Sequence, residues 1–401
     1  MVGHFRFLLP AAALALAAIL LCNSERPARV EAAGPVAPRF EVDPFWPKPL
    51  PNHWVLGQTI GVSVDAQGHV WIVHRPGSLE PGEVHATTNP PISKCCVPAP
   101  PVLEFDEAGN LVGHWGGPGP GFDWPDSNHG ITVDYKGNVW IGANGGGVPA
   151  PGSGFKNYDS MILKFSRTGQ FLMQIGKPNA SQGSNDVENL RQPAKIFVDP
   201  KRNEAYVADG YANHRVIVFD ADTGKYKRHW GAYGKKPSDN DLGSYDPAAA
   251  PAPQFRNPVH CAMLSHDDLL YVCDRGNDRI QVFRPDGAFV KEAFLEKQTR
   301  GSGSVWDIAF SSDPEQRFLY VADGENRQVR ILDRATLEVL TSFGDGGQQP
   351  GQFYGVHSIA TDARGNLYTT ETYRGQHVQK FIYKGLAPVT SKDQGVLWPA
   401  K

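Results

Sequence analysis

Three histidines recur at one position of an internal repeat, and they are the residues of this chain best suited to bind a metal ion. His129 lies in Ser-Asn-His-Gly-Ile, His260 in Asn-Pro-Val-His-Cys and His357 in Tyr-Gly-Val-His-Ser. The other repeats carry at this position Ile60, Ala194 and Trp306. Histidine therefore occupies every second repeat, and in a closed ring alternate repeats aim at one axis. Three neutral imidazoles form a typical zinc ligand set that leaves a fourth position open for water or substrate.

The loops after the second strand of each repeat would lie at the same mouth of the ring as these histidines. They contain Arg75, Tyr211 and Arg275, which could face a metal-bound substrate. An arginine guanidinium binds a carboxylate through two parallel hydrogen bonds, and a tyrosine hydroxyl beside a cation can act as an acid or a base. We interpret Arg215 and Arg279, in similar loops, as surface residues that stabilise turns.

The position that follows the histidine slot carries a charge in two repeats, at Lys195 and Asp307. A lone charge in a narrow channel is costly, so two such residues facing the axis should pair or meet a ligand. The alternative is that one or both side chains turn outward.

The repeat is a four-stranded β-meander. Each copy opens with an apolar strand that ends in a polar turn, and its third strand ends on an aromatic or apolar residue. The first strands are expected at 61–65, 130–134, 196–199, 261–264, 307–310 and 358–362. Fourth strands that close on an aromatic residue and Gly are expected at 114–116, 229–231 and 342–344. Period-two alternation with Asp-Gly and Gly-Asn turns indicates antiparallel hairpins.

Six such units predict an all-β protein, a six-bladed β-propeller over residues 57–387. The segment 33–56 could close the ring through Arg39–Val42, and 388–401 would form a tail. A pair of packed sheets would not explain the repeat phase. Insertions that would rim one mouth and shape a pocket occur at 76–100, 143–158 and 232–254.

The N-terminus predicts export. Arg6 precedes an apolar run that ends at Cys22, and small residues around Ala32 suit cleavage there, so 1–32 is predicted to be a signal peptide. We expect a secreted or periplasmic protein that is free of the membrane after cleavage. The net charge of −3 indicates no nucleic-acid partner. Nothing in the sequence marks an interface between copies, so we expect a monomer.

Four cysteines follow the predicted signal peptide, and an oxidising compartment would favour disulfides between them. Cys261 and Cys273 fall in adjacent predicted strands, which suits a cross-strand bridge. Cys95 and Cys96 are neighbours in a Pro-rich loop and could pair with each other or elsewhere. Four cysteines allow three connectivities, and the sequence does not choose among them.

The loop pattern Val-Ala-Asp-Gly-x-x-Asn-x-Arg resembles NHL repeats, and the order of the histidines and loops resembles peptidyl-α-hydroxyglycine α-amidating lyase over roughly residues 57–385. The resemblance implies a six-bladed NHL propeller whose catalytic zinc is held by His129, His260 and His357. It implies active-site roles for Arg75, Arg275 and Tyr211. The family splits a peptidyl-α-hydroxyglycine into a peptide amide and glyoxylate.

The chain departs from the family's pattern beside the third histidine. The family has an aspartate there that serves catalysis and a structural calcium ion, and this chain has Ser358. The backbone carbonyls that also bind this calcium ion in the family match those of Val62 and Ile131, but the carboxylate ligand is missing from this chain. We therefore do not expect Ca²⁺, and we hypothesise that an ion pair of Lys195 and Asp307 replaces it.

The resemblance thus implies an exported zinc-dependent lyase that cleaves the C–N bond of a carbinolamide-type substrate and releases glyoxylate. Its substrate would be a small molecule or peptide with a carboxylate. The alternative is a non-catalytic secreted NHL propeller that binds a protein, peptide or glycan, and the missing aspartate favours it. A calcium-dependent lactonase-like hydrolase would need axial carboxylates beyond Asp307.

Overall fold

The computed structural model describes residues 1–3, 34–145 and 159–399. The chain divides into two units, Met1–Pro35 and Val36–Lys401, and everything that follows concerns the second. Most of the predicted signal peptide, with Cys22, and most of the insertion at 143–158 lie outside the described residues. Within the described ranges, no helix has the length and apolar character needed to cross a bilayer.

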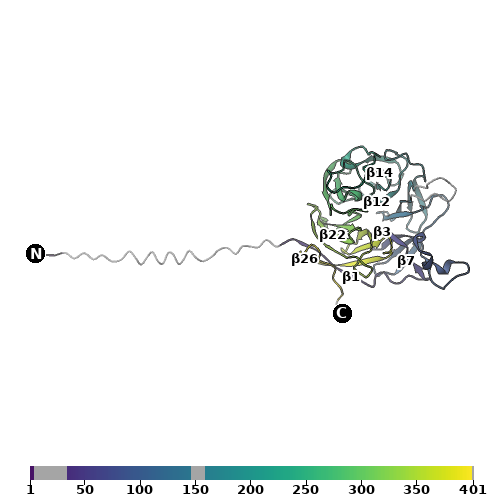
Figure 1. The fold of residues 1–401 in the computed structure, drawn as a ribbon, viewed down its shortest axis with the longest axis horizontal. Helices are drawn as coiled ribbons and strands as arrows, with labels where there is room; N and C mark the ends of the chain where they lie inside the picture. The colour runs from purple at the N-terminus through teal and green to yellow at the C-terminus, as the bar shows by residue number, and fades with distance from the viewer. Residues whose placement is uncertain (4–33, 146–158, 400–401) are drawn as a thin grey trace. The chain divides into compact units, whose positions relative to one another are not determined.

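Six four-stranded antiparallel sheets make up the unit, as a six-bladed β-propeller requires (Figure 1). The first strand of every sheet contacts the first strand of the next, and the sixth returns to the first, so these strands form a closed inner ring. This confirms the predicted fold class. The inner strands are β3 (Gln58–Val64), β8 (Asn128–Val133), β12 (Pro193–Asp199), β16 (Val259–Leu264), β20 (Asp307–Phe310) and β24 (Val356–Thr361).

The remaining strands follow outward in chain order, apart from the outer strand of the sixth blade. The second strands are β4 (Val70–Arg75), β9 (Val139–Ala143), β13 (Glu204–Asp209), β17 (Leu270–Asp274), β21 (Phe318–Asp323) and β25 (Leu367–Glu371). The third strands are β6 (Val102–Phe105), β10 (Met161–Phe165), β14 (Arg215–Asp220), β18 (Arg279–Phe283), β22 (Gln328–Asp333) and β26 (Val378–Pro388). The outer strands of the first five blades are β7 (Leu111–Trp115), β11 (Phe171–Gly176), β15 (Tyr226–Trp230), β19 (Phe289–Phe294) and β23 (Val339–Phe343).

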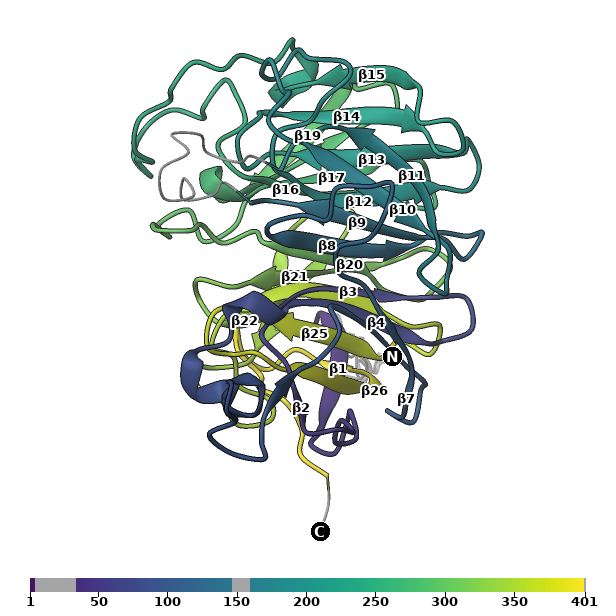
Figure 2. The same cartoon turned by 90° about the vertical axis from the view of Figure 1, so that its right-hand side faces the viewer.

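The outer strand of the sixth blade comes from the start of the unit. This strand, β1 (Val36–Asp43), contains Arg39–Val42 and pairs antiparallel with β26. Figure 2 shows the purple β1 beside the yellow β26. Because the two ends of the propeller share one sheet, the ring is held closed by backbone hydrogen bonds.

Short elements occupy the insertions. A two-stranded parallel sheet joins β2 (Trp54–Val55) to β5 (Val97–Pro98). The 3-10 helices are η1 (Pro76–Ser78), η2 (Pro81–Glu83), η3 (His85–Thr87), η4 (Ala232–Gly234) and η5 (Arg275–Asn277). The insertion at 76–100 therefore has its own local structure, and the first of its helices follows directly on Arg75.

A recurring aspartate fixes the turn between the first and second strands. In the first blade Asp65 accepts a 2.9 Å hydrogen bond from the indole of Trp71. In the second blade Asp134 accepts the same contact from Trp140, also at 2.9 Å. The turn glycine that follows Asp65, Gly68, has φ of +81°, a conformation that favours glycine. The sequence repeat thus encodes the hairpin geometry directly.

Both pairs of described cysteines form disulfides, Cys95–Cys96 and Cys261–Cys273. Cys261 and Cys273 lie opposite each other in the register of β16 and β17, which is the predicted cross-strand bridge. This bridge joins β16, the inner strand that carries His260, to β17.

Candidate metal centre

The three predicted ligands converge at the axis of the propeller. His129, His260 and His357 are 1%, 2% and 4% exposed, and their candidate ligand atoms all lie within 4.8 Å of one another. Their ring centroids are 4.8 to 5.0 Å apart. They come from β8, β16 and β24, which belong to alternate blades. The repeat phase therefore places three imidazoles at one point.

Local irregularities of the inner strands aim these side chains at the axis. In each of the three blades the pairing of the inner strand with the second strand is irregular. It shifts between His129 and Ile131, and neither His260 nor His357 has a partner residue in the second strand. Such bulges release a residue from the ladder and redirect its side chain. Gly130 is required in the second blade because a Cβ there would lie 2.4 Å from the carbonyl oxygen of Ala194.

Each histidine is fixed by a carbonyl from the next blade. The Nδ1 atoms lie against the carbonyl oxygens of Ala194 for His129 (2.8 Å), Trp306 for His260, and Ile60 for His357 (2.8 Å). These acceptors occupy the histidine slot of the three remaining repeats, so the ring alternates imidazole and carbonyl. Because a carbonyl oxygen only accepts, Nδ1 carries the proton and the Nε2 lone pair is left for a ligand. This is the usual outer support of a metal-bound histidine.

Tyr211 bridges two of the imidazoles. Its hydroxyl lies 3.0 Å from Nε2 of both His129 and His260, and Nη1 of Arg275 donates to it at 3.2 Å. The hydroxyl has one proton to donate, whereas two Nε2 lone pairs face it. Burial lowers the pKa of all three histidines well below the usual range, so they stay neutral at neutral pH. A cluster with more lone pairs than protons suits a cation, and three imidazoles suit Zn²⁺.

Arg75 lies at the edge of this centre, at the end of β4. Its Nε donates to the carbonyl of Asn128 at 3.1 Å, its Nη1 to Gln58 Oε1 at 3.1 Å and its Nη2 to Asn144 Oδ1 at 2.7 Å. These contacts use one N–H of each nitrogen, so each terminal nitrogen keeps a second N–H to offer a ligand. Gln58 and Asn144 were not predicted from the sequence, because no motif marks them.

Arg275 is the first residue of the 3-10 helix η5 and contacts the Tyr211 hydroxyl. Its Nε donates to the carbonyl of Ser302 at 2.7 Å, and its guanidinium carbon lies 4.1 Å from the centroid of a Trp306 ring. Trp306 is 1% exposed and lies edge-on to His357, with centroids 5.6 Å apart. The stacked tryptophan fixes the plane of the guanidinium, a role that the sequence did not reveal.

The predicted surface positions of Arg215 and Arg279 are wrong. Both side chains are fully buried, and their Nε atoms lie 2.8 Å from Asp209 and 2.6 Å from Asp274. Each pair closes one of the loops that carry Tyr211 and Arg275. A buried arginine with a carboxylate and backbone acceptors is satisfied internally, which explains why a charged residue lies inside the blade.

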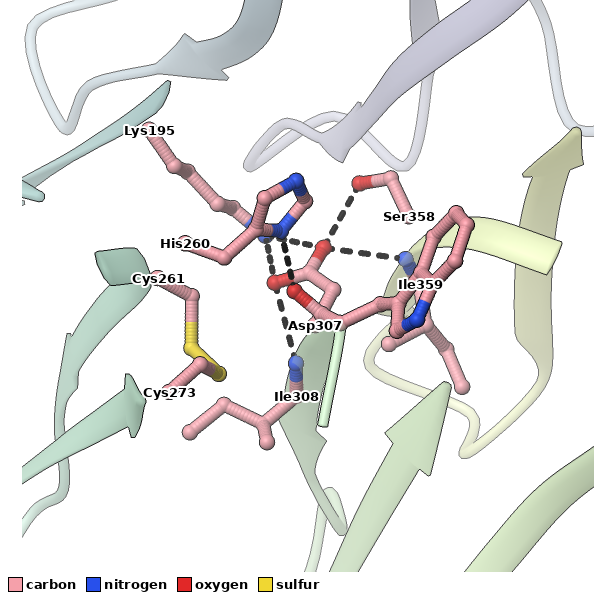
Figure 3. The surroundings of a disulfide bond; sticks show 9 residues. Lys195, His260, Cys261, Cys273, Asp307, Ile308, Ser358 and Ile359 are labelled. Atoms are coloured by element: carbon pink, nitrogen blue, oxygen red, sulfur yellow. Dashed lines mark hydrogen bonds and ion pairs between the residues drawn. A yellow bond between two sulfur atoms is a disulfide. The ribbon is translucent and has the colours of Figure 1, made fainter. Parts of the chain in front are cut away.

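Lys195 and Asp307 form the expected ion pair inside the channel, one residue beyond the histidine slot. Lys195 Nζ lies 2.7 and 2.6 Å from the two carboxylate oxygens (Figure 3). Ser358 donates to Asp307 at 2.6 Å. An ammonium group already neutralises this carboxylate, and a calcium site needs several oxygen ligands around the cation itself. The residues therefore do not fit the calcium ion that the family resemblance implied.

A second group of side chains lies close enough together to hold a metal ion, and it consists of Asp65, His69 and Glu104. Arg167 pairs with both carboxylates, lying 2.7 Å from Asp65. His69 Nδ1 lies 2.6 Å from Glu104. Since the Arg167 guanidinium already pairs with both carboxylates, we interpret this group as a salt bridge between the first and second blades rather than a competing metal site.

An open cleft of about 510 Å³ adjoins the metal centre and shares Trp306 with it. Tyr354 and Tyr373 add aromatic surface to its wall. Arg327 lies over the ring of Tyr354 at 5.4 Å. The cleft could hold the part of a substrate that extends away from the histidines.

The fold and site define a six-bladed β-propeller with a buried three-histidine group that could bind a metal. The chain matches no protein-family model. It is 32% identical over 166 residues to peptidylglycine α-amidating monooxygenase of Rattus norvegicus, a match that spans 41% of this chain and 14% of the rat protein. The matched part is therefore a small share of that relative's length.

Two further relatives match over most of the chain. Peptidyl-α-hydroxyglycine α-amidating lyase 1 of Drosophila melanogaster is 24% identical over 365 residues, which is 85% of this chain and 59% of the fly protein. NHL repeat-containing protein 3 of Mus musculus is 24% identical over 311 residues, covering 76% and 70%. The chain is thus related to amidating lyases and to NHL repeat proteins.

Proposed function

We propose that this protein is a zinc-dependent lyase that cleaves the C–N bond of an α-hydroxyglycine-type substrate. The products would be an amide and glyoxylate. The observation that carries the proposal is the convergence of three neutral imidazoles whose Nδ1 atoms are each fixed by a carbonyl. A propeller without a metal has no need of three lone pairs at one buried point. The names of the amidating-lyase relatives support the reaction class.

Zn²⁺ bound by the three histidines would supply a Lewis acid for the substrate's oxygen. Arg75 and Arg275 flank the centre with unused N–H donors and would hold the carboxylate. The Tyr211 hydroxyl, which Arg275 contacts, would relay a proton: its oxygen would take the proton of the substrate hydroxyl as its own O–H proton passes to the amide nitrogen. As the C–N bond breaks and the C=O bond of glyoxylate forms, one proton must reach the amide nitrogen. The proton lost by the hydroxyl equals the one gained by nitrogen, so the reaction is balanced.

The cleft beside Trp306 would receive the acyl side of the substrate. Its aromatic wall favours a planar or apolar group next to the scissile bond, and two arginines that also line the cleft, Arg327 and Arg374, favour an anionic one. We propose that the partner is a small molecule or peptide with a carboxylate, handled by a monomer that works outside the cytoplasm.

Glyoxylate release from α-hydroxyhippurate tests the reaction. The zinc-replete protein should release glyoxylate in proportion to its concentration, and Arg275→Met should lose most of that activity while keeping its metal. Metal-replete protein that releases none would reject this reaction.

A non-catalytic binding propeller is the second candidate. Ser358 stands beside the third histidine, where the amidating lyases would have a carboxylate, and it donates to Asp307 instead of facing the centre. That observation favours binding over catalysis. Absence of metal from protein purified without chelators would support it.

A further inference from the structure

The ion pair in the channel lies one residue from the carbonyls that support two of the three imidazoles. Lys195 follows Ala194, whose carbonyl fixes His129, and Asp307 follows Trp306, whose carbonyl fixes His260. Ser358 follows His357 itself. Figure 3 shows Lys195 and Ser358 converging on the Asp307 carboxylate beside His260. A second layer of side chains thus underlies the layer of histidines.

Asp307 is the centre of this second layer. Besides both contacts from Lys195 and the one from Ser358, it accepts backbone N–H bonds from Ile308 at 2.9 Å and Ile359 at 3.1 Å. Lys195, Asp307 and Ser358 are 8%, 1% and 4% exposed. The backbone N–H of Val62 in the first blade reaches Ser358 Oγ at 3.4 Å. The layer therefore ties together four blades, including the two that meet at the closure of the ring.

We propose that Lys195, Asp307 and Ser358 form a positioning layer that sets the spacing of the three histidines, with the Lys195 ammonium as the built-in cation of the channel. The inference rests on the metal binding of the proposed function. It adds that metal affinity depends on three residues that do not contact the metal, and that the channel needs no added divalent cation.

The physical reason is the cost of an unpaired buried charge. Without the ammonium, the Asp307 carboxylate would have to turn towards water or take up a proton. Either change would shift the start of β20, directly after the Trp306 carbonyl that fixes His260. Loss of the outer support of a metal-bound histidine typically weakens metal affinity by about 10–100-fold.

The test uses the full exported chain and measures Zn²⁺ affinity by chelator competition, together with the visible spectrum of the Co²⁺-substituted protein. Lys195→Met should bind Zn²⁺ about 10–100-fold more weakly and should alter the Co²⁺ spectrum. The matched control is Lys136→Met, which removes an ion pair of the same 2.6 Å length from an exposed site. It should leave affinity and spectrum unchanged.

Two further variants keep the test decisive if Lys195→Met does not fold. Ser358→Ala removes one hydroxyl from the layer and should weaken Zn²⁺ binding by a smaller factor. The exchanged pair Lys195→Asp with Asp307→Lys keeps the ion pair and should restore part of the affinity. Wild-type affinity and an unchanged spectrum in Lys195→Met or in Ser358→Ala would overturn the inference.

Addition of calcium provides an independent test of this inference. Millimolar Ca²⁺ should not raise the melting temperature of the unaltered protein, and a clear rise would contradict the role given to the ammonium. Unaltered protein that binds no Zn²⁺ would overturn the proposed function itself. Normal Zn²⁺ binding by both the unaltered and the Lys195→Met proteins would overturn this inference alone.

Discussion

His74 should make the stability of the propeller fall as the solution becomes acidic. This residue precedes Arg75 in β4 and is fully buried. The N–H of Gly57 donates to its Nδ1 at 3.1 Å, and its Nε2 donates to the carbonyl of Pro100 at 3.0 Å. Burial lowers its pKa to about 4, against 6.5 for the ordinary side chain. The folded protein therefore favours the neutral His74 ring, and protonation of this ring destabilises the fold.

The sign follows from the difference in proton binding. Between pH 6.5 and 4 the unfolded chain holds a proton on His74 and the folded chain does not, so the free energy of unfolding falls as the pH falls through this window. With about 1.4 kcal/mol for each pKa unit, the largest contribution is about 3 kcal/mol, of which about 2 kcal/mol is lost between pH 7.5 and pH 5.

Urea unfolding at pH 7.5 and pH 5, with EDTA present, measures this contribution. The His74→Gln protein should lose about 2 kcal/mol less than the unaltered protein over that interval. Asp159 titrates in the same window with the opposite sign, because burial raises its pKa to about 6, but it is present in both proteins and cancels. His266→Gln, at an exposed position, is the control. Equal losses in the unaltered and His74→Gln proteins would refute the reasoning.

Three other changes have defined outcomes. Tyr211→Phe should keep its zinc but lose about 10²–10⁴-fold in the rate of glyoxylate release, because it loses the proton-transferring hydroxyl; an undiminished rate would remove Tyr211 from the mechanism. Arg215→Met should lower the free energy of unfolding by about 3–5 kcal/mol, because it leaves Asp209 buried and unpaired; a urea titration that shows less than about 0.5 kcal/mol would match a surface residue instead. Replacing Cys261 and Cys273 together by Ala should cost roughly 3 kcal/mol for the closed loop between them, and a melting temperature equal to that of the oxidised parent would contradict this.

Repeat phase explains why the convergence of the three histidines could be predicted from the sequence. In a ring, residues at one phase of the repeat occupy equivalent places, so the positions of His129, His260 and His357 follow from their alignment alone. The same reasoning gave Lys195 and Asp307 equivalent places one residue further on, and it left open whether both side chains would face the channel. It did not show that Ser358 would join them, because a serine can face solvent or a buried carboxylate equally well.

Contacts between blades were harder to predict. Gln58 and Asn144 meet at Arg75 from separate segments, and no local pattern marks them. The aromatic residue followed by Gly that marked the other outer strands in sequence is incomplete in two of them: β11 ends on Ile175-Gly176, and β19 ends on Phe294 with no Gly after it.

The buried arginines were misassigned for a different reason. Because both residues are charged and lie in predicted loops, the sequence suggested that Arg215 and Arg279 are exposed at the surface. The aspartate that ends the preceding strand supplies the internal partner of each arginine. A carboxylate five or six residues before an arginine in this loop is the signal that could have corrected the prediction.

The zinc content of the full-length protein tests the central claim most directly. Elemental analysis of protein purified without chelators should find close to one zinc per chain, and none in His357→Ala that still melts cooperatively. A folded parent protein that carries no zinc and takes none up on dialysis would contradict the account.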